Sequence, residues 1–305
     1  MSNTIELSKK RDFGELISDS FVFVRENFVP LVKCFFIFCG FFLVATVVFG
    51  WITEAKVIKA TTDLSSFNSD NFDNSTNPFA VFAQLFGVEY FLLILVSLLG
   101  YVTIFLTVIS YMAVYKAKGN KPATPAEVWG YFKYYFLKIT GSTVIVFILL
   151  VLGCVCCLIP GIWLYPILTL IFPIIIVENR SFGDAFNQSF RLIKENWWTT
   201  FGALFVMGII VAILRAIITM PIGAVDVISL FLSRGKNMHL SPTLMLISLV
   251  AGEIAHIFYI LSFVTLTLCY FSLTEQKDAV GLMERIQQLG GNNDADKTDK
   301  PAEEY

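Results

Sequence analysis

The chain has 305 residues, of which 56% are hydrophobic and only 15% are charged, and its mean hydropathy is +0.71. Soluble domains carry about 25% charged residues, so this composition excludes an ordinary soluble globular protein. The formal net charge of −2, without any basic block, gives no support to nucleic-acid binding.

Long uncharged intervals predict six transmembrane helices, because a spanning helix needs about 20 predominantly apolar residues. No Asp, Glu, Lys or Arg occurs in the intervals 34–53, 90–115, 139–177 and 196–214. The third interval is nearly long enough for two spans and contains Ile159-Pro160-Gly161, which predicts a tight helical hairpin. The predicted spans are 30–52, 88–115, 140–158, 162–177, 198–220 and 242–273.

The segment 181–202 begins as an amphipathic helix and continues into an apolar run. Ser181 is a good N-cap, and Asp184 three residues later approximates a capping box. Apolar residues recur at the three- and four-residue spacing of one helix face. They are Phe182, Ala185, Phe186, Ser189 (small), Phe190, Ile193 and Trp197. An amphipathic helix with aromatic residues beside a span is typical of the headgroup plane.

Two further segments repeat this pattern, and each precedes a pair of spans. They are 12–28, capped by Asp12, and 124–138, capped by Thr124. An offset of 169 aligns Phe13-Gly14 with Phe182-Gly183, Ser20-Phe21 with Ser189-Phe190, and Glu26-Asn27 with Glu195-Asn196. The sequence therefore predicts an all-α, polytopic membrane bundle of six spans. They form three repeats, each an amphipathic interfacial helix (about 12–28, 124–138 and 181–197) plus a helical hairpin.

The basic residues predict the orientation. With both termini inside, all but five of the 22 Lys and Arg residues lie in inner segments, as the positive-inside rule requires. The five outer residues are Lys56, Lys59, Arg215, Arg234 and Lys236. The amphipathic helices then line the cytoplasmic face, where basic side chains meet anionic lipid headgroups. These headgroup-facing residues are Arg25, Lys133, Lys138, Arg191 and Lys194.

The domain organisation follows from the same patterns. Residues 1–275 form the six-span domain, and 276–305 form a short cytoplasmic helix (278–289) and a disordered tail. The polar start predicts no cleavable signal peptide, and the polar interval 56–84 predicts an outer loop. All six cysteines lie in or at the ends of apolar spans, where Cys behaves as a small hydrophobe. No disulfide framework is therefore expected.

The stretch 158–202 resembles a broad bacterial group, the membrane domains named after glycerophosphoryl diester phosphodiesterases. The features that carry the resemblance are Ile159-Pro160-Gly161, the pair Pro173 and Glu178, Phe182-x-x-Ala185, Ser189-Phe190-Arg191-Leu192 and Asn196-Trp197-Trp198 with Phe201-Gly202. The resemblance implies a six-span fold in a bacterial inner membrane. It carries no catalytic residue, because the chain has no soluble stretch long enough for a phosphodiesterase domain.

Glu253 and His256 form the candidate ligand or proton site. They lie three residues apart on one face of the last span, near mid-membrane, where ionisable groups are costly and often functional. A structural contact with a neighbouring helix is the alternative. A metal site would need a second such motif and two more glutamates, which the sequence lacks. Arg215, near the outer end of the fifth span, is predicted to reach Glu253, with Asp226 as its competing partner.

Small residues in the last two spans predict close helix packing. Gly208, Ala212 and Ala216 form one small-xxx-small ridge, and Ala251 and Ala255 form another, so the fifth and sixth spans are expected side by side. The run 154–157, which holds three cysteines, is likewise interpreted as membrane packing.

Three functions stay open at this stage. The first is a non-catalytic envelope scaffold or a handler of lipid or small hydrophobic molecules, since no P-loop, nucleophile elbow, zinc-protease or dinucleotide motif occurs. The second is a transporter with its polar site at Glu253 and His256. The third is an intramembrane enzyme, which would need a second polar cluster. The first predicts no enzyme activity, no metal and no cofactor. Its expected partners are membrane lipids, with homo-oligomers or other membrane proteins as protein partners.

Overall fold

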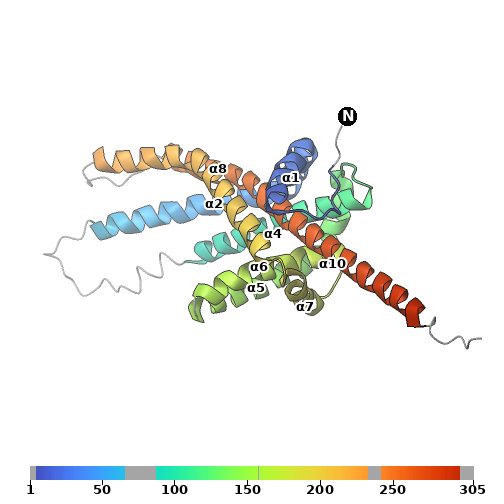
Figure 1. The fold of residues 1–305 in the computed structure, drawn as a ribbon. Coiled ribbons are helices and arrows are strands. Elements are labelled where there is room, and N and C mark those ends of the chain that lie inside the picture. The colour runs from blue at the N-terminus through green and yellow to red at the C-terminus, as the bar shows by residue number, and fades with distance from the viewer. Residues whose placement is uncertain (1–4, 66–86, 157, 233–241, 296–305) are drawn as a thin grey trace, which may run out of the picture.

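The computed structural model describes residues 5–65, 87–156, 158–232 and 242–295, and all regular secondary structure in these ranges is helical. The elements are α1 (Phe13–Glu26), α2 (Phe28–Ser65), α4 (Val88–Ala117), α5 (Pro125–Cys156), α6 (Leu158–Glu178), α7 (Phe182–Ile193), α8 (Trp197–Leu232), α9 (Pro242–Ile254), the 3₁₀ helix η1 (Ala255–Phe258) and α10 (Tyr259–Ala295). Figure 1 shows them as one bundle, with α1 and α7 toward the end from which α10 projects.

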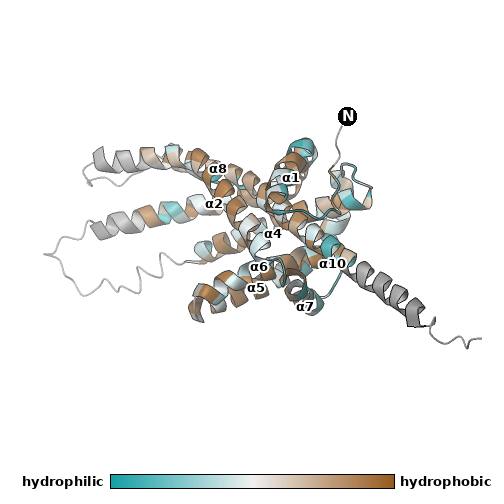
Figure 2. Cartoon of the chain, in the orientation of Figure 1, coloured by the Kyte–Doolittle hydropathy of each residue, from teal (hydrophilic) through white to brown (hydrophobic). Residues whose placement is uncertain are grey.

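Six stretches in the described residues are long and apolar enough to cross a membrane, as the uncharged intervals predict. They are Phe28–Ile58, Val88–Ala117, Pro125–Val155, Ile159–Glu178, Trp197–Val225 and Pro242–Ala279. Hydrophobic residues predominate along these helices, while hydrophilic residues gather on α1, on α7 and around the connections at that end (Figure 2). By helix length and hydropathy, the chain is a multi-pass membrane protein.

The core of the bundle forms where α4, α6 and α10 meet. α4 is buried on all sides from Val102 to Tyr115, and α10 is buried from Phe263 to Leu273. α2 and α5 pack on α4, and α8 packs on α10. α9 lies between α2 and α8, so the fifth and sixth spans are side by side, as predicted. The central helices α4 and α10 thus make the contacts that hold the outer helices α2, α5 and α8 in place.

The segment 124–138 is not a separate interfacial helix, which corrects one part of the predicted arrangement. α5 runs from Pro125 to Cys156 without a break, so the amphipathic turns continue directly into the third span. α1, by contrast, ends at the cap Asn27, and Pro30 cannot donate a backbone hydrogen bond to the Glu26 carbonyl. No proline or asparagine occupies the equivalent place in α5, so the helix has no reason to stop.

The sixth span differs from the single continuous helix that was expected. α9 ends at Ile254, one 3₁₀ turn follows from Ala255 to Phe258, and α10 begins at Tyr259. A 3₁₀ helix has about 3.0 residues per turn instead of 3.6, so this turn changes the direction in which the side chains of α9 face relative to those of α10. A 3₁₀ turn inside a longer helix often marks a functional hinge or strain. Glu253 and His256 flank the start of this turn.

Two helices run further than predicted. α8 continues through Pro221 to Leu232, where a separate outer segment was expected from residue 221, and 233–241 lie outside the described residues. α10 continues from the sixth span to Ala295, so the predicted cytoplasmic helix at 278–289 is part of it, together with the first residues of the predicted tail. The rest of the tail and most of the predicted outer loop lie outside the described residues.

The hairpin between α5 and α6 depends on a glycine. A Cβ at Gly161 would lie 2.4 Å from Cys154 Sγ and 3.1 Å from the Cys154 nitrogen, so no larger residue fits this crossing. Ile159-Pro160-Gly161 was expected to form the turn between the two helices. It lies instead in the first turn of α6. Cys34, Cys39, Cys154 and Cys269, whose side chains the structure describes, are free.

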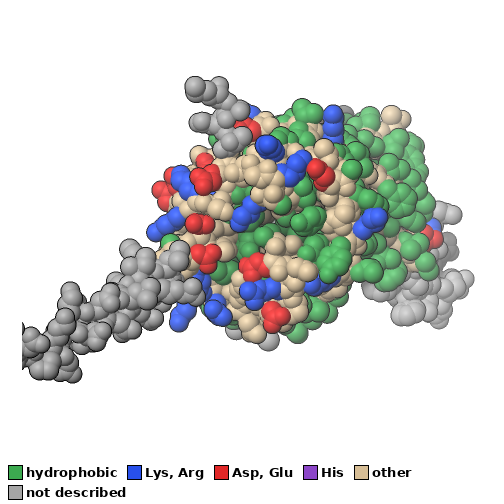
Figure 3. Space-filling view, turned by 90° about the vertical axis from the view of Figure 1, so that its right-hand side faces the viewer, with side chains coloured by type: hydrophobic (Ala, Val, Ile, Leu, Met, Phe, Trp, Pro, Cys, Tyr) green, Lys and Arg blue, Asp and Glu red, His purple; other side chains and the backbone are tan. Residues whose placement is uncertain are grey.

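The end of the bundle that carries α1, α7 and the connection 118–124 is called the charged end. Figure 3 looks onto it and shows Lys, Arg, Asp and Glu side chains gathered over the face. The capping box of α1 is complete, with Asp12 and Glu15 each accepting the other's backbone N–H. The hydrogen bond from Lys9 Nζ to Glu15 (2.8 Å) holds the pKa of that carboxyl below its ordinary value. α1 and α7 are therefore separate capped helices at this end.

α7 buries one face, but the division of its faces differs from the sequence prediction in one position. Gln188 lies outside the predicted apolar stripe, yet it is half-buried and donates to both carboxylate oxygens of Glu178 (2.7 and 3.0 Å). Phe190 packs on Phe186, with ring centroids 5.0 Å apart, and on Trp163 at 6.1 Å. Asn187 is exposed and makes a better control position than Gln188.

We expect Phe190→Asp to lower the free energy of unfolding in detergent by at least about 2 kcal/mol, because it puts a carboxylate among aromatic rings. Asn187→Asp should change it by no more than about 0.5 kcal/mol, since the side chain is exposed. Thermal unfolding of the two purified variants measures the difference. Equal destabilisation would contradict the assignment of the buried face of α7.

Candidate functional site

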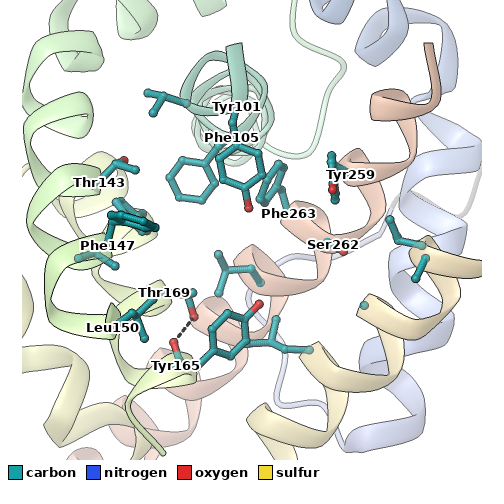
Figure 4. Close-up of a pocket in the computed structure, with 18 of the residues that line it drawn as sticks. Tyr101, Phe105, Thr143, Phe147, Leu150, Tyr165, Thr169, Tyr259, Ser262 and Phe263 are labelled. Atoms are coloured by element: carbon teal, nitrogen blue, oxygen red, sulfur yellow. Dashed lines mark hydrogen bonds between the residues drawn. The ribbon is translucent and has the colours of Figure 1, made fainter. Parts of the chain in front are cut away.

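A cavity of 620 Å³ lies between α4, α5, α6, α8 and α10 (Figure 4). Its volume falls in the range of ligand pockets, about 300–1,000 Å³. The lining residues are Tyr101, Val102, Phe105, Thr143, Val146, Phe147, Leu150, Tyr165, Thr169, Phe172, Leu204, Gly208, Val211, Ala212, Arg215, Ala216, Thr219, Tyr259, Ser262, Phe263 and Leu266. All five helices that contribute include stretches able to span a membrane. The cavity therefore lies within the membrane-spanning part of the bundle.

The walls of the cavity are aromatic and aliphatic, with a few hydroxyl groups. Tyr101 and Tyr165 expose 46% and 43% of their surface, respectively. Their hydroxyls point into the space from α4 and α6 (Figure 4). Neither hydroxyl makes a hydrogen bond to another described residue. Thr143 and Thr169 instead donate to carbonyls of their own helices. The free phenols can bind a ligand's polar atoms.

The ridge of small residues on α8 faces this cavity, whereas the sequence predicted that it packs closely against a neighbouring helix. Gly208, Ala212 and Ala216 all line the space. A Cβ added at Gly208 would meet no atom within 4 Å. The fifth and sixth spans do lie side by side. On α8, however, these small residues make room instead of bringing two backbones together.

Arg215 is the single charged side chain that lines the cavity among the described residues. It follows the first residue of α8 by 18 positions, about 27 Å along the helix, and so lies away from the charged end. Arg215 Nη1 donates to the hydroxyl oxygen of Tyr259, and its guanidinium carbon lies 4.8 Å from the centroid of that ring. A phenol oxygen and a π face both favour a desolvated guanidinium.

The structure brings the three predicted site residues together only in part. Glu253 Oε2 lies 3.5 Å from His256 Nδ1, without the geometry of a hydrogen bond. The His256 ring lies 5.5 Å from the Tyr259 ring. Glu253 and His256 do not line the cavity, and no described carboxylate lies within 4.0 Å of Arg215. The predicted Arg215–Glu253 pair is thus absent from the described residues, and the side chain of Asp226 lies outside them.

Sequence reasoning missed Tyr259, which connects the others. It follows His256 by three positions and is the first residue of α10. Its neighbours are Arg215 by hydrogen bond and His256 by ring contact, so it joins the cavity to the helix break. The sequence does contain a signal for Tyr259. It is a tyrosine, which carries a polar hydroxyl, about one helical turn after the ionisable residues Glu253 and His256 in an apolar span. We name Arg215, Glu253, His256 and Tyr259 the polar cluster.

The predicted headgroup-facing residues lie at or near the charged end. Arg25, Lys133, Arg191 and Lys194 are exposed, and Lys138 is half-buried. The ammonium groups of Lys133 and Lys138 lie over the rings of Trp129 (5.4 Å) and Tyr135 (5.9 Å). A long cationic side chain beside an aromatic ring is the arrangement found at membrane interfaces. Contact with lipid headgroups stays a prediction.

One further titratable residue, Glu89, lies at the end of a span outside the polar cluster. Glu89, at the start of α4, pairs with Lys56 on α2 at 2.6 Å, which makes it a contact between helices. Among the described residues, no group of three or more His, Cys, Asp or Glu side chains could hold a metal ion. The polar cluster and the cavity beside it are therefore the candidate site.

Comparison with protein-family models, with curated proteins and with solved structures returned no match. The resemblance to the glycerophosphoryl diester phosphodiesterase membrane domains thus stays a prediction. The fold and the site define a coarser class, a multi-pass membrane protein with an intramembrane cavity and a broken sixth span.

Tyr259→Phe should destabilise the protein by about 1.5–3 kcal/mol, because it removes the acceptor of a charged donor in an apolar setting. Tyr101→Phe is the matched control, since it removes a hydroxyl that bonds no described residue, and should change stability by less than about 0.5 kcal/mol. Thermal unfolding in detergent measures both. A control as damaging as Tyr259→Phe would show that the Arg215–Tyr259 hydrogen bond is not the stabilising contact.

Proposed function

We propose that this protein is a non-catalytic integral membrane protein that binds a lipid or a small hydrophobic molecule in the cavity between α4, α5, α6, α8 and α10. The observation that carries the proposal is the cavity itself: 620 Å³ with a mostly apolar lining, inside the spanning part of the bundle. A tightly packed scaffold needs no such space, because empty volume forfeits dispersion contacts and costs stability. An occupant from the membrane restores those contacts.

Access from the bilayer supports this function. In the described residues α5 and α8 form two walls of the cavity without packing closely against each other. Phe147 on α5 exposes 59% of its surface, and Gly208 and Ala212 on α8 are exposed as well. A molecule dissolved in the lipid phase can enter between these two helices without crossing a polar barrier.

The setting of the protein belongs to the same proposal. We place it in the bacterial cytoplasmic membrane, on the resemblance of 158–202, with both termini inside, on the distribution of Lys and Arg. The charged end then faces the cytoplasm, where an envelope scaffold would meet lipid headgroups and partner proteins. A further copy of the chain or another membrane protein is the protein partner we propose, and no enzyme activity is expected.

Transport is the second candidate, and one observation favours it. The sixth span breaks at Ala255–Phe258, where Glu253 and His256 lie. Discontinuous helices near the middle of the membrane form the substrate and ion sites of many transporters. Against this function, neither Glu253 nor His256 lines the cavity, and in the described residues the cavity reaches the break through Tyr259 alone.

To test binding, we fill the cavity with Gly208→Phe, which the open space at that Cβ admits. The protein is purified in mild detergent, and the lipid retained per chain is measured by native mass spectrometry. We expect at least a tenfold loss of retained lipid. Ile209→Phe, at an exposed position that does not line the cavity, should keep the wild-type amount. Equal retention by both variants would sink the binding function.

To separate the two functions, we replace Glu253 with Gln, which keeps the shape and removes the charge. If lipid binding is the function, Glu253→Gln should retain lipid within about twofold of wild type. It should also complement a deletion strain. Failure to complement, with unchanged thermal stability and unchanged lipid retention, would favour a proton-linked transporter instead.

A further inference from the structure

We propose that the occupant of the cavity is a single-chain anionic amphiphile whose oxyanion headgroup binds Arg215 beside Tyr259. This inference rests on the proposed binding function and adds the charge and shape of the ligand. Three features support it: the charge of the lining, the hydrogen-bond donors of Arg215 and the dimensions of the space.

The charge of the lining is unbalanced. Arg215 is the one charged side chain on the walls, and no acidic side chain lines the cavity among the described residues. Glu253, the expected counter-ion, lies against His256 and attracts Arg215 only from beyond 4.0 Å, so the described hydrogen-bond partner of the guanidinium is the neutral phenol of Tyr259. A half-buried cation in a span, with no described carboxylate in direct contact, is costly. An anionic ligand supplies the missing charge.

The donors of the guanidinium fit an oxyanion. Arginine carries five N–H donors in a planar fork that matches carboxylate and phosphate geometry. In the described part of the chain, the fork makes one hydrogen bond, to the Tyr259 oxygen. The remaining donors of a side chain that lines the cavity are available to a ligand. Ser262, half-buried on α10 and also in the lining, adds a hydroxyl on the same helix as Tyr259.

The dimensions fit one acyl chain. On α8 the lining runs from Leu204 to Thr219, about 22 Å of helix, with Arg215 near one end. Between Leu204 and Arg215 the lining residues of α8 are Gly208, Val211 and Ala212, all apolar. Phe147 and Phe172 face the same space from α5 and α6. The lining therefore offers a long apolar surface with one cationic end.

The headgroup chemistry is an oxyanion on a single chain, either a carboxylate or a phosphate monoester, and the experiment distinguishes the two. The probes share one oleoyl chain: oleate, oleoyl lysophosphatidic acid and the uncharged monooleoylglycerol. Native mass spectrometry of the full chain in a non-ionic detergent gives the dissociation constant of each probe. We expect wild type to bind at least one anionic probe ten times more tightly than monooleoylglycerol. Which anion is preferred identifies the headgroup.

Arg215→Gln should bring the affinity for the anionic probes to within about twofold of that for monooleoylglycerol, because the counter-charge is gone. Arg215→Lys should keep part of the anionic preference, since lysine is a cation without the planar fork. Lys121→Gln, an exposed position in the connection 118–124, removes one positive charge elsewhere and should leave the preference unchanged. This control accounts for any general attraction of anionic probes to the protein.

The outcomes separate this inference from the function on which it rests. Equal affinities of wild type for all three probes, with binding still lost in Gly208→Phe, would overturn the anionic headgroup and leave the cavity as a binding site. No binding of any probe by wild type would overturn both. If Arg215→Gln does not fold, the probe ranking of wild type and of Arg215→Lys decides the matter without it.

Discussion

The bilayer offers no water to an unpaired polar group, and the architecture follows from this constraint. Each backbone N–H and C=O must find a partner inside the protein, which only helices and closed barrels provide across a membrane. Most polar side chains inside the spans obey the same rule, with Ser110 Oγ and His256 Nδ1 as buried exceptions. Thr103, Thr107 and Thr267 are buried, and each donates its hydroxyl to the carbonyl four residues earlier. Thr169 donates its hydroxyl to the backbone carbonyls of Tyr165 and Pro166, in the helix that contains Pro166 and Pro173.

The same constraint explains why the polar cluster stands out from the rest of the bundle. Most polar groups in the spans are satisfied within their own helix, whereas Arg215 reaches across to Tyr259 on another element. Glu253 and His256 lie where the helix itself changes from α to 3₁₀. The 3₁₀ turn Ala255–Phe258 and the guanidinium of Arg215 lie in one region. The hydroxyls of Tyr101 and Tyr165, which bond no described residue, line the cavity beside it. In a protein that otherwise minimises exposed polarity, such a gathering is a strong indication of a ligand.

Much of the fold could be predicted from sequence, because uncharged length is a direct measure of the ability to cross a membrane. The six spans and the caps at Asp12 and Ser181 are confirmed, while the three-fold repeat stays a prediction. The break at Ala255–Phe258 could not be predicted, since no proline occurs there and the residues suit an α-helix. The cavity could not be predicted either. Small residues such as Gly208 and Ala212 serve close packing as well as open space, and only the neighbouring helix decides which.

The two amphipathic helices, α1 and α7, are hydrogen-bonded to helices that form cavity walls and do not only lie on the surface. Glu178, the last residue of α6, accepts from Gln188 of α7 and from Tyr270 of α10 (2.7 Å each). At α1, Ser20 accepts from Thr265 of α10 (2.8 Å), and the backbone N–H of the buried Arg11 donates to Ser272 (2.9 Å). α6 and α10 are walls of the cavity, so these hydrogen bonds connect the charged end to two of the walls. α10 therefore contacts both amphipathic helices and also lines the cavity.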